Sequence, residues 1–182
     1  STYQSASGAG AAAMEELEVS TRAYLKGELY EPKVLPHPYA FNLFSHNTTI
    51  GPDGYNGEET KVVAELRKIM GLPDLRVGVT CVRVPVLRAH SMAVTVEFAD
   101  KVSVEKAREL LASAPGLKLV DNREANHFPM PVESGGQDDV LVGRIREDIS
   151  DPTGHSLALF ISGDQLLKGA ALNAVQIAER LV

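Results

Sequence analysis

The chain has 182 residues, of which 44% are hydrophobic and 23% charged, as in an ordinary soluble globular domain. The formal net charge of −6 leaves no broad basic field for a phosphodiester backbone, so we expect no nucleic-acid partner. No apolar run approaches the ~20 residues of a membrane span, so we expect no membrane partner, and the single cysteine, Cys81, excludes an internal disulfide. We therefore expect a cytoplasmic protein or one from an organelle stroma.

Apolar residues recur at helical spacing in two early segments. The spacing predicts a first helix over residues 10–25 and a second over 57–70, where Val62, Leu66 and Ile69 share one stripe. The segment between the two helices is rich in proline and glycine and shows no period. Irregular crossings of this length are usually functional or wrapped around another surface.

The period changes from helical to alternating after Val77. Alternation predicts a strand over 77–84, which Pro85 interrupts, and a second strand over 90–98. A helix over 103–113, capped by Ser103, follows. Short strands are predicted at 117–120, 139–146 and 156–162, and a last helix at 165–182. Strands gathered in the middle, with helices before, between and after them, predict an α+β domain. Its sheet would be mixed and largely antiparallel, with helices on one face.

Cations interrupt the apolar run RVPVLRAHSMAV, although an unpaired buried charge is costly. A bend at Pro85 would let Arg83 and His90 enter one cleft, where they would offer a permanent cation for a carboxylate and a group that titrates near neutrality. The alternative is a surface arginine plus a core histidine with an ordinary hydrogen bond, and spacing alone favours it. Arg88 is expected to be solvated.

Glu58 and Lys61 stand at positions i and i+3 of the second helix, so their side chains are neighbours. Such a pair would suit a zwitterionic, phosphorylated substrate. The more common interpretation is a solvated ion pair worth roughly a few tenths of a kcal/mol.

Three further features are weaker. SGAG at 7–10 precedes a helix, and free backbone N–H groups there could hold an anion or a carboxamide. Asn173 lies on a small-residue face of the last helix, where its amide needs a partner. Cys81 lies among valines, the setting of a buried, inert thiol, and the spacing of the five histidines predicts no metal site.

Four stretches together resemble a known family. STYQSASGAG, GEETKVV, TCVRVPVLRAHSMAV and GDQLLKGAALNAVQIAE are similar, in that order, to the C-terminal half of aspartate-β-semialdehyde dehydrogenases, and the match spans 1–182. AFNLFSHN resembles the variety found in plants and some bacteria, which would place a plant protein in the plastid stroma. The resemblance implies a catalytic and dimerisation domain like the C-terminal domain of dihydrodipicolinate reductase. It would form a homodimer or a dimer of dimers through one sheet face, and 165–182 would pack on an NADP-binding domain.

The family reduces aspartyl-β-phosphate with NADPH to aspartate semialdehyde and phosphate, through a cysteine thioester. Carried onto this sequence, the resemblance implies that Gln4 orients the substrate and that His90 is the acid/base. Arg83 would bind the α-carboxylate, Glu58 the amino group and Lys61 the phosphate.

The resemblance also implies that Ser7, Gly8 and Asn173 contact the nicotinamide end of NADP, which is bound mainly by the other domain. The family's nucleophilic cysteine and Gly-rich nucleotide fold lie upstream of STYQ, so this chain alone is expected to be inactive. Two alternatives remain: a related acyl-phosphate or acyl-CoA reductase, for which a carboxylate such as Glu58 would have no free amine to bind, and a dimerisation module without chemistry.

Overall fold

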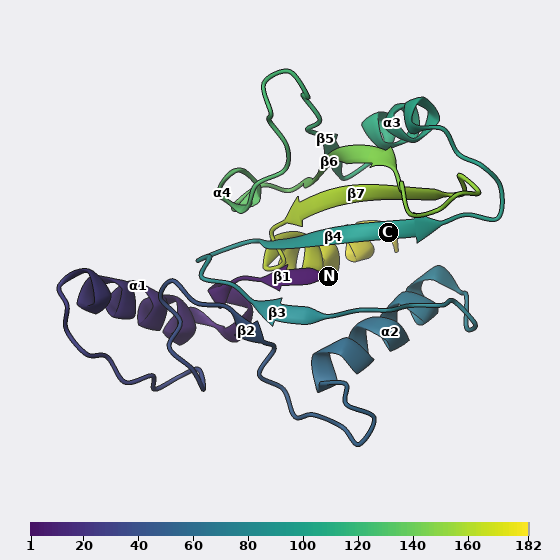
Figure 1. Ribbon diagram of the computed structural model, residues 1–182. Helices are drawn as coiled ribbons and strands as arrows, with labels where there is room; N and C mark the ends of the chain where they lie inside the picture. Colours follow the sequence, from purple (N-terminus) through teal and green to yellow (C-terminus); the bar gives the residue numbers. More distant parts are fainter. Residues whose placement is uncertain (182) are drawn as a thin grey trace. The chain divides into compact units, whose positions relative to one another are not determined.

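The structure is a computed structural model that describes residues 1–181 and divides into two compact units (Figure 1). The first unit comprises Ser1–Leu87 and the second Arg88–Val182. Each unit combines helices with a small mixed sheet, so the predicted α+β class is confirmed.

The first unit contains three short strands and two long helices. β3 is the middle strand: it pairs in parallel with β1 and antiparallel with β2. The elements are β1 (Thr2–Gln4), the 3₁₀ helix η1 (Ala6–Ala9), α1 (Ala11–Leu25), β2 (Phe44–Ser45), α2 (Gly57–Met70) and β3 (Cys81–Arg83).

Helix α2 has the bounds that the sequence predicts. Asn56 accepts a hydrogen bond from the Glu59 backbone, and the Glu59 carboxylate accepts one from the Asn56 backbone, which closes a capping box. Gly71 ends the helix in the left-handed conformation, where a β-carbon would be strained.

Strand β3 is shorter than the predicted 77–84. Its parallel partner β1 pairs with only three residues, Cys81 to Arg83, so the ladder ends there. The second carboxylate oxygen of Glu59 accepts the Cys81 N–H at 3.0 Å and joins the start of α2 to this strand. The Cys81 thiol is fully buried, and burial raises its pKa, as expected for an inert thiol.

One buried carboxylate organises the irregular crossing after α1. Glu16 is 4% exposed and accepts backbone N–H bonds from Lys33, Val34 and Leu35 at 2.5, 2.8 and 2.9 Å. The crossing therefore packs Leu35 and Tyr39 into the core formed with α1. The Tyr39 hydroxyl donates to the carbonyl of Val84, the residue directly after β3, at 2.5 Å.

The second unit is built on four strands in the order β4, β7, β6, β5, antiparallel except for the parallel β5–β6 pair. Ala107 of α3 packs with Ile145 and Leu157 in its core. The elements are β4 (His90–Glu97), α3 (Val104–Ser113), β5 (Leu117–Leu119), α4 (Pro131–Ser134), β6 (Val140–Glu147), β7 (Ser156–Gly163), the π-helical turn η2 (Leu167–Ala171) and α5 (Leu172–Glu179). Ser103 caps α3 as predicted, accepting the Lys106 N–H.

A glycine allows the close approach of two segments in this unit. A β-carbon on Gly143 would lie 1.9 Å from the Val120 carbonyl oxygen, well inside any real contact. The β6–β7 register shifts between Gly143 and Arg146, and Arg144 there takes a positive φ of 54°.

The C-terminal helical segment is not one regular helix. Instead of a single helix over 165–182, a π-helical turn leads into α5, and the Ala171 N–H bonds the Leu166 carbonyl five residues back. The expected last residue, 182, lies outside the described part, and whether 165–182 packs on another domain stays a prediction.

Arg88 is not a freely solvated side chain, contrary to expectation. Its Nε donates to Asp164 at 2.7 Å, and that carboxylate is completely buried. Asp164 also accepts the N–H groups of Gly136 and Leu166. Burial of an unpaired carboxylate would be costly, which explains why an arginine reaches it.

Among residues 1–181, no helix has both the length and the apolar composition needed to cross a membrane. That part of the chain also holds no group of three or more His, Cys, Asp or Glu side chains arranged for a metal ion.

Candidate functional site

Three of the predicted residues meet at the end of β1 and the first turns of α2. The Gln4 amide donates to the Glu58 carboxylate at 3.2 Å, and the other oxygen of Glu58 pairs with Lys61 at 2.7 Å. The Glu58 side chain is largely buried, whereas Lys61 is half exposed. The site therefore holds a carboxylate and an ammonium side by side, with an amide fixed against the carboxylate.

Arg83 belongs to the same unit, on the strand that pairs directly with β1. Gln4 and Arg83 are register partners in the parallel ladder. Arg83 is only 4% exposed, so a buried guanidinium lies beside the residues above. Its Nε donates to Asn47 Oδ1 at 3.1 Å, and its Nη1 donates to the Ser5 carbonyl at 3.3 Å.

The segment 44–48, FSHNT, contacts two of these residues, Arg83 and Glu58. Phe44 pairs with Arg83 in the antiparallel β2–β3 ladder, and Asn47, three residues later, accepts a hydrogen bond from the guanidinium. The Thr48 hydroxyl accepts the backbone N–H of Glu58 at 3.0 Å. One short segment thus contacts both the cation on β3 and the start of α2.

The charges of the site influence one another. Burial alone would raise the pKa of Glu58, but hydrogen bonds from Lys61 and Gln4 outweigh it, and the pKa lies below its ordinary value. Burial, with the Arg83 charge, lowers the pKa of His46, so this imidazole is neutral at pH 7. Burial raises the pKa of Tyr39 to about 12, against the opposing effect of Arg83. Glu58, its ion-pair partner Lys61 and Arg83 are therefore the charged groups, and His46 and Tyr39 are neutral.

The backbone donors predicted at 7–10 are already used. The N–H of Ser7 bonds the Leu87 carbonyl at 2.9 Å, that of Gly8 bonds Ser5 at 3.2 Å and that of Gly10 bonds Ser7 at 3.1 Å. A ligand there would find the exposed Gly8 backbone and its carbonyl instead of a set of free N–H groups. The N–H groups of Ser7, Gly8 and Gly10 are not free as expected, because local turn carbonyls accept two of them and the Leu87 carbonyl accepts the third.

The remaining two predicted residues lie in the second unit. His90 is the first residue of β4 and is half-buried, and its carbonyl accepts the Ser162 hydroxyl at 3.3 Å. Asn173 is half-buried in α5. Arg83 belongs to the first unit and His90 to the second. A cleft shared by Arg83 and His90 therefore stays a prediction.

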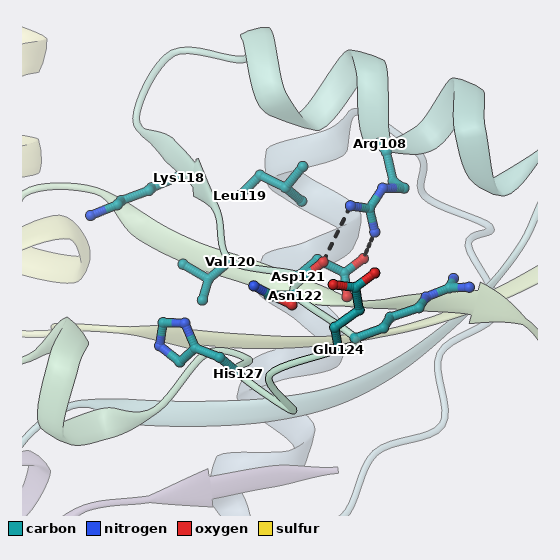
Figure 2. A pocket seen from close by; sticks show the side chains of 9 residues that line it. Arg108, Lys118, Leu119, Val120, Asp121, Asn122, Glu124 and His127 are labelled. Carbon is teal, nitrogen blue, oxygen red and sulfur yellow. Dashed lines mark hydrogen bonds and ion pairs between the residues drawn. The ribbon is translucent and has the colours of Figure 1, made fainter.

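A separate cavity of about 720 Å³ lies in the second unit beside α3 and β5 (Figure 2). None of the predicted site residues lines it. Figure 2 shows Arg108 reaching from α3 to Asp121, whose carboxylate is fully buried, and the two form an ion pair. Arg123 donates to the Ile145 carbonyl, and His127 pairs with Glu133 at 2.8 Å. The two arginines Arg108 and Arg123 therefore serve the fold, and none of the residues proposed for the functional site reaches this cavity.

Sequence reasoning missed three residues of the site. Asn47, Thr48 and His46 lie in a loop without a period, and their partners are distant: Asn47 and Arg83 are 36 positions apart. The run SHNTT is polar within the long crossing, and AFNLFSHN carries a family resemblance, but neither signal assigns these residues a partner.

Comparison with known proteins places the chain in a family. The model described as "Semialdehyde dehydrogenase, dimerisation domain" matches residues 1–168. The chain is 59% identical over 181 residues to an aspartate-semialdehyde dehydrogenase of Synechocystis, and 50% identical to one of Prochlorococcus marinus. These matches cover 100% of this chain but 53% and 52% of the two relatives. The chain thus spans about half the length of the curated relatives it matches.

Solved structures agree. Aspartate semialdehyde dehydrogenase II of Vibrio cholerae, complexed with ASA, superposes with a TM-score of 0.92 at 41% identity, over 98% of this chain and 52% of that one. A probable aspartate-semialdehyde dehydrogenase of Pseudomonas aeruginosa gives 0.90 at 30% identity, over 99% and 53%. The fold described above is therefore the fold of about half of each of these enzymes.

Proposed function

We propose that this chain is the substrate-binding and dimerisation half of an aspartate-semialdehyde dehydrogenase. The proposal starts from the family to which the chain belongs, that of semialdehyde dehydrogenase dimerisation domains. The reaction would convert aspartyl-β-phosphate to aspartate semialdehyde and phosphate, through a cysteine thioester whose cysteine belongs to another part of the full protein. The observation that carries the proposal is the cluster of Gln4, Glu58, Lys61 and Arg83 in one unit.

The charges of this cluster match the substrate. A buried guanidinium is suited to a carboxylate because its planar fork offers paired donors. Glu58, ionised at neutral pH, is suited to the amino group on the same carbon. Lys61, half exposed beside Glu58, is suited to the phosphate that enters or leaves.

Gln4 and His90 are the residues proposed to act at the reacting carbon. The Glu58 contact fixes the Gln4 amide, so Gln4 would orient the acyl group beside the thiol. His90 would take the thiol proton and later handle the proton of the thiohemiacetal oxygen, a role that suits an imidazole near neutral pH. Placement of His90 at the head of a strand is compatible with this role.

The proposed cofactor is NADP, which supplies the hydride. Two residues of this chain are suited to contact a small part of NADP. Gly8 presents exposed backbone without a side chain, and the Asn173 amide offers both a donor and an acceptor. Ser7 is buried and bonded to Ser5, so it would shape this surface rather than bind directly. Most of the binding would belong to a nucleotide-binding domain outside this chain.

The assembly and location follow from the same family. The name of the family supports a homodimer, and we propose that a dimer of dimers is the larger form. The substrate is a small molecule, and the place of action would be the cytoplasm, or the plastid stroma in a plant.

A second candidate reaction is reduction of a related acyl phosphate or acyl-CoA. Glu58 decides between them, because a carboxylate aimed at an amine has no partner when that amine is acylated or absent. The presence of Glu58 next to Gln4 and Lys61 therefore favours the free amino acid. A dimerisation module without chemistry would have no need of this cluster.

The test joins this chain to the remaining half of the Synechocystis relative. We expect phosphate-dependent reduction of NADP with aspartate semialdehyde and at least 100-fold lower kcat/KM with its N-acetylated form, because of the unpaired carboxylate. Equal or better turnover of the acetylated substrate would overturn the assignment. A folded, dimeric hybrid inactive on both substrates would favour the module without chemistry.

A further inference from the structure

We propose that Asn47 is a positioning residue that sets which edge of the Arg83 guanidinium receives the substrate carboxylate. The inference rests on the proposed role of Arg83 and assigns a role to a loop residue outside the helices and strands. It is carried by one contact, the 3.1 Å hydrogen bond from Arg83 Nε to Asn47 Oδ1.

A guanidinium has two edges that match a carboxylate. One edge joins Nε to Nη2, and the other joins Nη1 to Nη2. Asn47 occupies the Nε donor and so closes the first edge to bidentate binding. The Ser5 carbonyl takes one of the two Nη1 hydrogens and leaves the second.

The second edge stays open. Arg83 Nη2 donates to no described residue, and it is not sealed from solvent. A carboxylate would thus meet one Nη1–H and one Nη2–H. With both Nε and Nη1 held, the guanidinium cannot rotate about its last side-chain torsions, so the open edge points in one fixed direction before a ligand arrives.

The loop itself is fixed on both sides of Asn47. Before it, the His46 N–H bonds the Cys81 carbonyl at 2.9 Å, which continues the strand contact of β2. After it, Thr48 accepts the N–H of Glu58 at the start of α2. Asn47 is therefore held between the carboxylate-binding and amine-binding residues of the proposed site.

Asn47 contributes little else to the stability of the fold. The residue is exposed and lies outside both hydrophobic core clusters, and its side chain has no other hydrogen bond within residues 1–181. The side-chain oxygen of Asn47 accepts its hydrogen bond from the buried guanidinium of Arg83, so Asn47 influences the position of that guanidinium more than the packing of the core. Its replacement should therefore alter ligand binding without unfolding the protein.

The experiment uses the full-length hybrid enzyme and the substitutions Asn47→Ala, Arg83→Ala and the double variant. We expect Asn47→Ala to raise KM for aspartate semialdehyde about tenfold, the usual effect of losing one hydrogen bond to a charged group, while kcat changes less and KM for phosphate stays constant. In the Arg83→Ala background, Asn47→Ala should have no further effect, since it acts only through the guanidinium.

Asn42 provides the matched control. It is an exposed asparagine five residues earlier whose amide bonds the Pro38 carbonyl, and Asn42→Ala should leave KM unchanged. If Arg83→Ala raises KM but Asn47→Ala does not, or if the two effects are additive, the role of Asn47 is overturned and that of Arg83 stands. If Arg83→Ala leaves KM unchanged, the proposed carboxylate site itself is wrong. A fall in Tm with parallel changes in both KM values would show a merely structural role and overturn the inference.

Discussion

The side-chain amide of Gln4 donates to the Glu58 carboxylate at 3.2 Å, although 54 positions separate the two residues in the chain. This contact joins the first strand to the start of α2. It also leaves Glu58 shared between an amide and the Lys61 ammonium, so its charge is already partly compensated before any ligand binds. The amino group of a substrate would complete this arrangement.

Glu58→Gln removes the charge and keeps the shape. In the full-length hybrid we expect KM for aspartate semialdehyde to rise at least tenfold, because the ammonium of the substrate loses its anionic partner. Stability should change by less than about 1 kcal/mol, since Lys61 is half exposed and water replaces the lost contact. Steady-state kinetics and urea unfolding measure both. Glu65→Gln, on an exposed turn of the same helix, is the control, and an equal response of the two variants would contradict the assignment.

Arg83→Lys keeps the charge but replaces the planar fork with a single ammonium. The paired contact to a carboxylate is lost, so we expect a raised KM and a lower kcat, with kcat/KM down by roughly 100-fold. Arg22→Lys tests the effect of the exchange itself, because Arg22 lies exposed on α1 in an ion pair with Glu18. An unchanged kcat/KM in Arg83→Lys would remove Arg83 from the site.

Glu16→Gln tests the anchor of the crossing after α1. The amide cannot accept three N–H bonds as a carboxylate does, so we expect a loss of about 2–4 kcal/mol in the free energy of unfolding at pH 7. Urea unfolding measures the loss. Glu18→Gln, two positions later and half exposed, should cost far less, and equal losses would contradict the role of Glu16.

The same carboxylate predicts how stability depends on pH. Burial alone would raise the pKa of Glu16, but the backbone donors outweigh it, and the folded pKa lies below the ordinary value. The unfolded state therefore binds a proton first as the pH falls. The contribution of Glu16 is complete above the unfolded pKa of about 4.3 and is lost as pH falls through the folded pKa. Wild type should lose more stability than Glu16→Gln over this range, and parallel curves would refute the prediction.

Gly143→Ala tests the close approach in the second unit. A β-carbon would lie 1.9 Å from the Val120 carbonyl oxygen and 2.9 Å from Pro129, so the backbone must move. We expect a loss of about 3 kcal/mol or more in the free energy of unfolding, at the upper end of strain from overpacking. Gly78→Ala is the control, because nothing lies within 4 Å of its β-carbon. Equal stability of the two variants, measured by urea unfolding, would show that the segments holding Val120 and Pro129 can move away from β6 at no cost.

Local signals predicted the elements, and distant contacts decided their limits. Helix α2 was predictable because its cap residues, Asn56 and Glu59, and its terminator, Gly71, are adjacent to it in sequence. Strand β3 was predicted too long because alternation continues through 77–84, while its length depends on the three residues of β1. Strand β2 was missed because two residues carry no period.

The same distinction applies to the site. Arg83, Glu58 and Lys61 were singled out by their positions in the sequence, Gln4 was added by the resemblance to a family, and the structure places all four in one unit. Asn47 was missed because its importance depends on a guanidinium 36 positions away. The buried partner of Arg88 was missed for the same reason, since Asp164 lies 76 positions further on.

The two oxygens of Glu59 are divided between α2 and β3: one closes the helix cap at Asn56, and the other accepts the Cys81 N–H two residues before Arg83. The helix that carries Glu58 and the strand that carries Arg83 are thus fastened to each other by a single buried side chain. In the proposed site, the distance between the Glu58 carboxylate and the Arg83 guanidinium is therefore fixed when the chain folds. An α-amino acid carries its amino and carboxylate groups on one carbon, so both groups fit this fixed distance. A ligand whose two charged groups lie further apart would have to break the cap of α2.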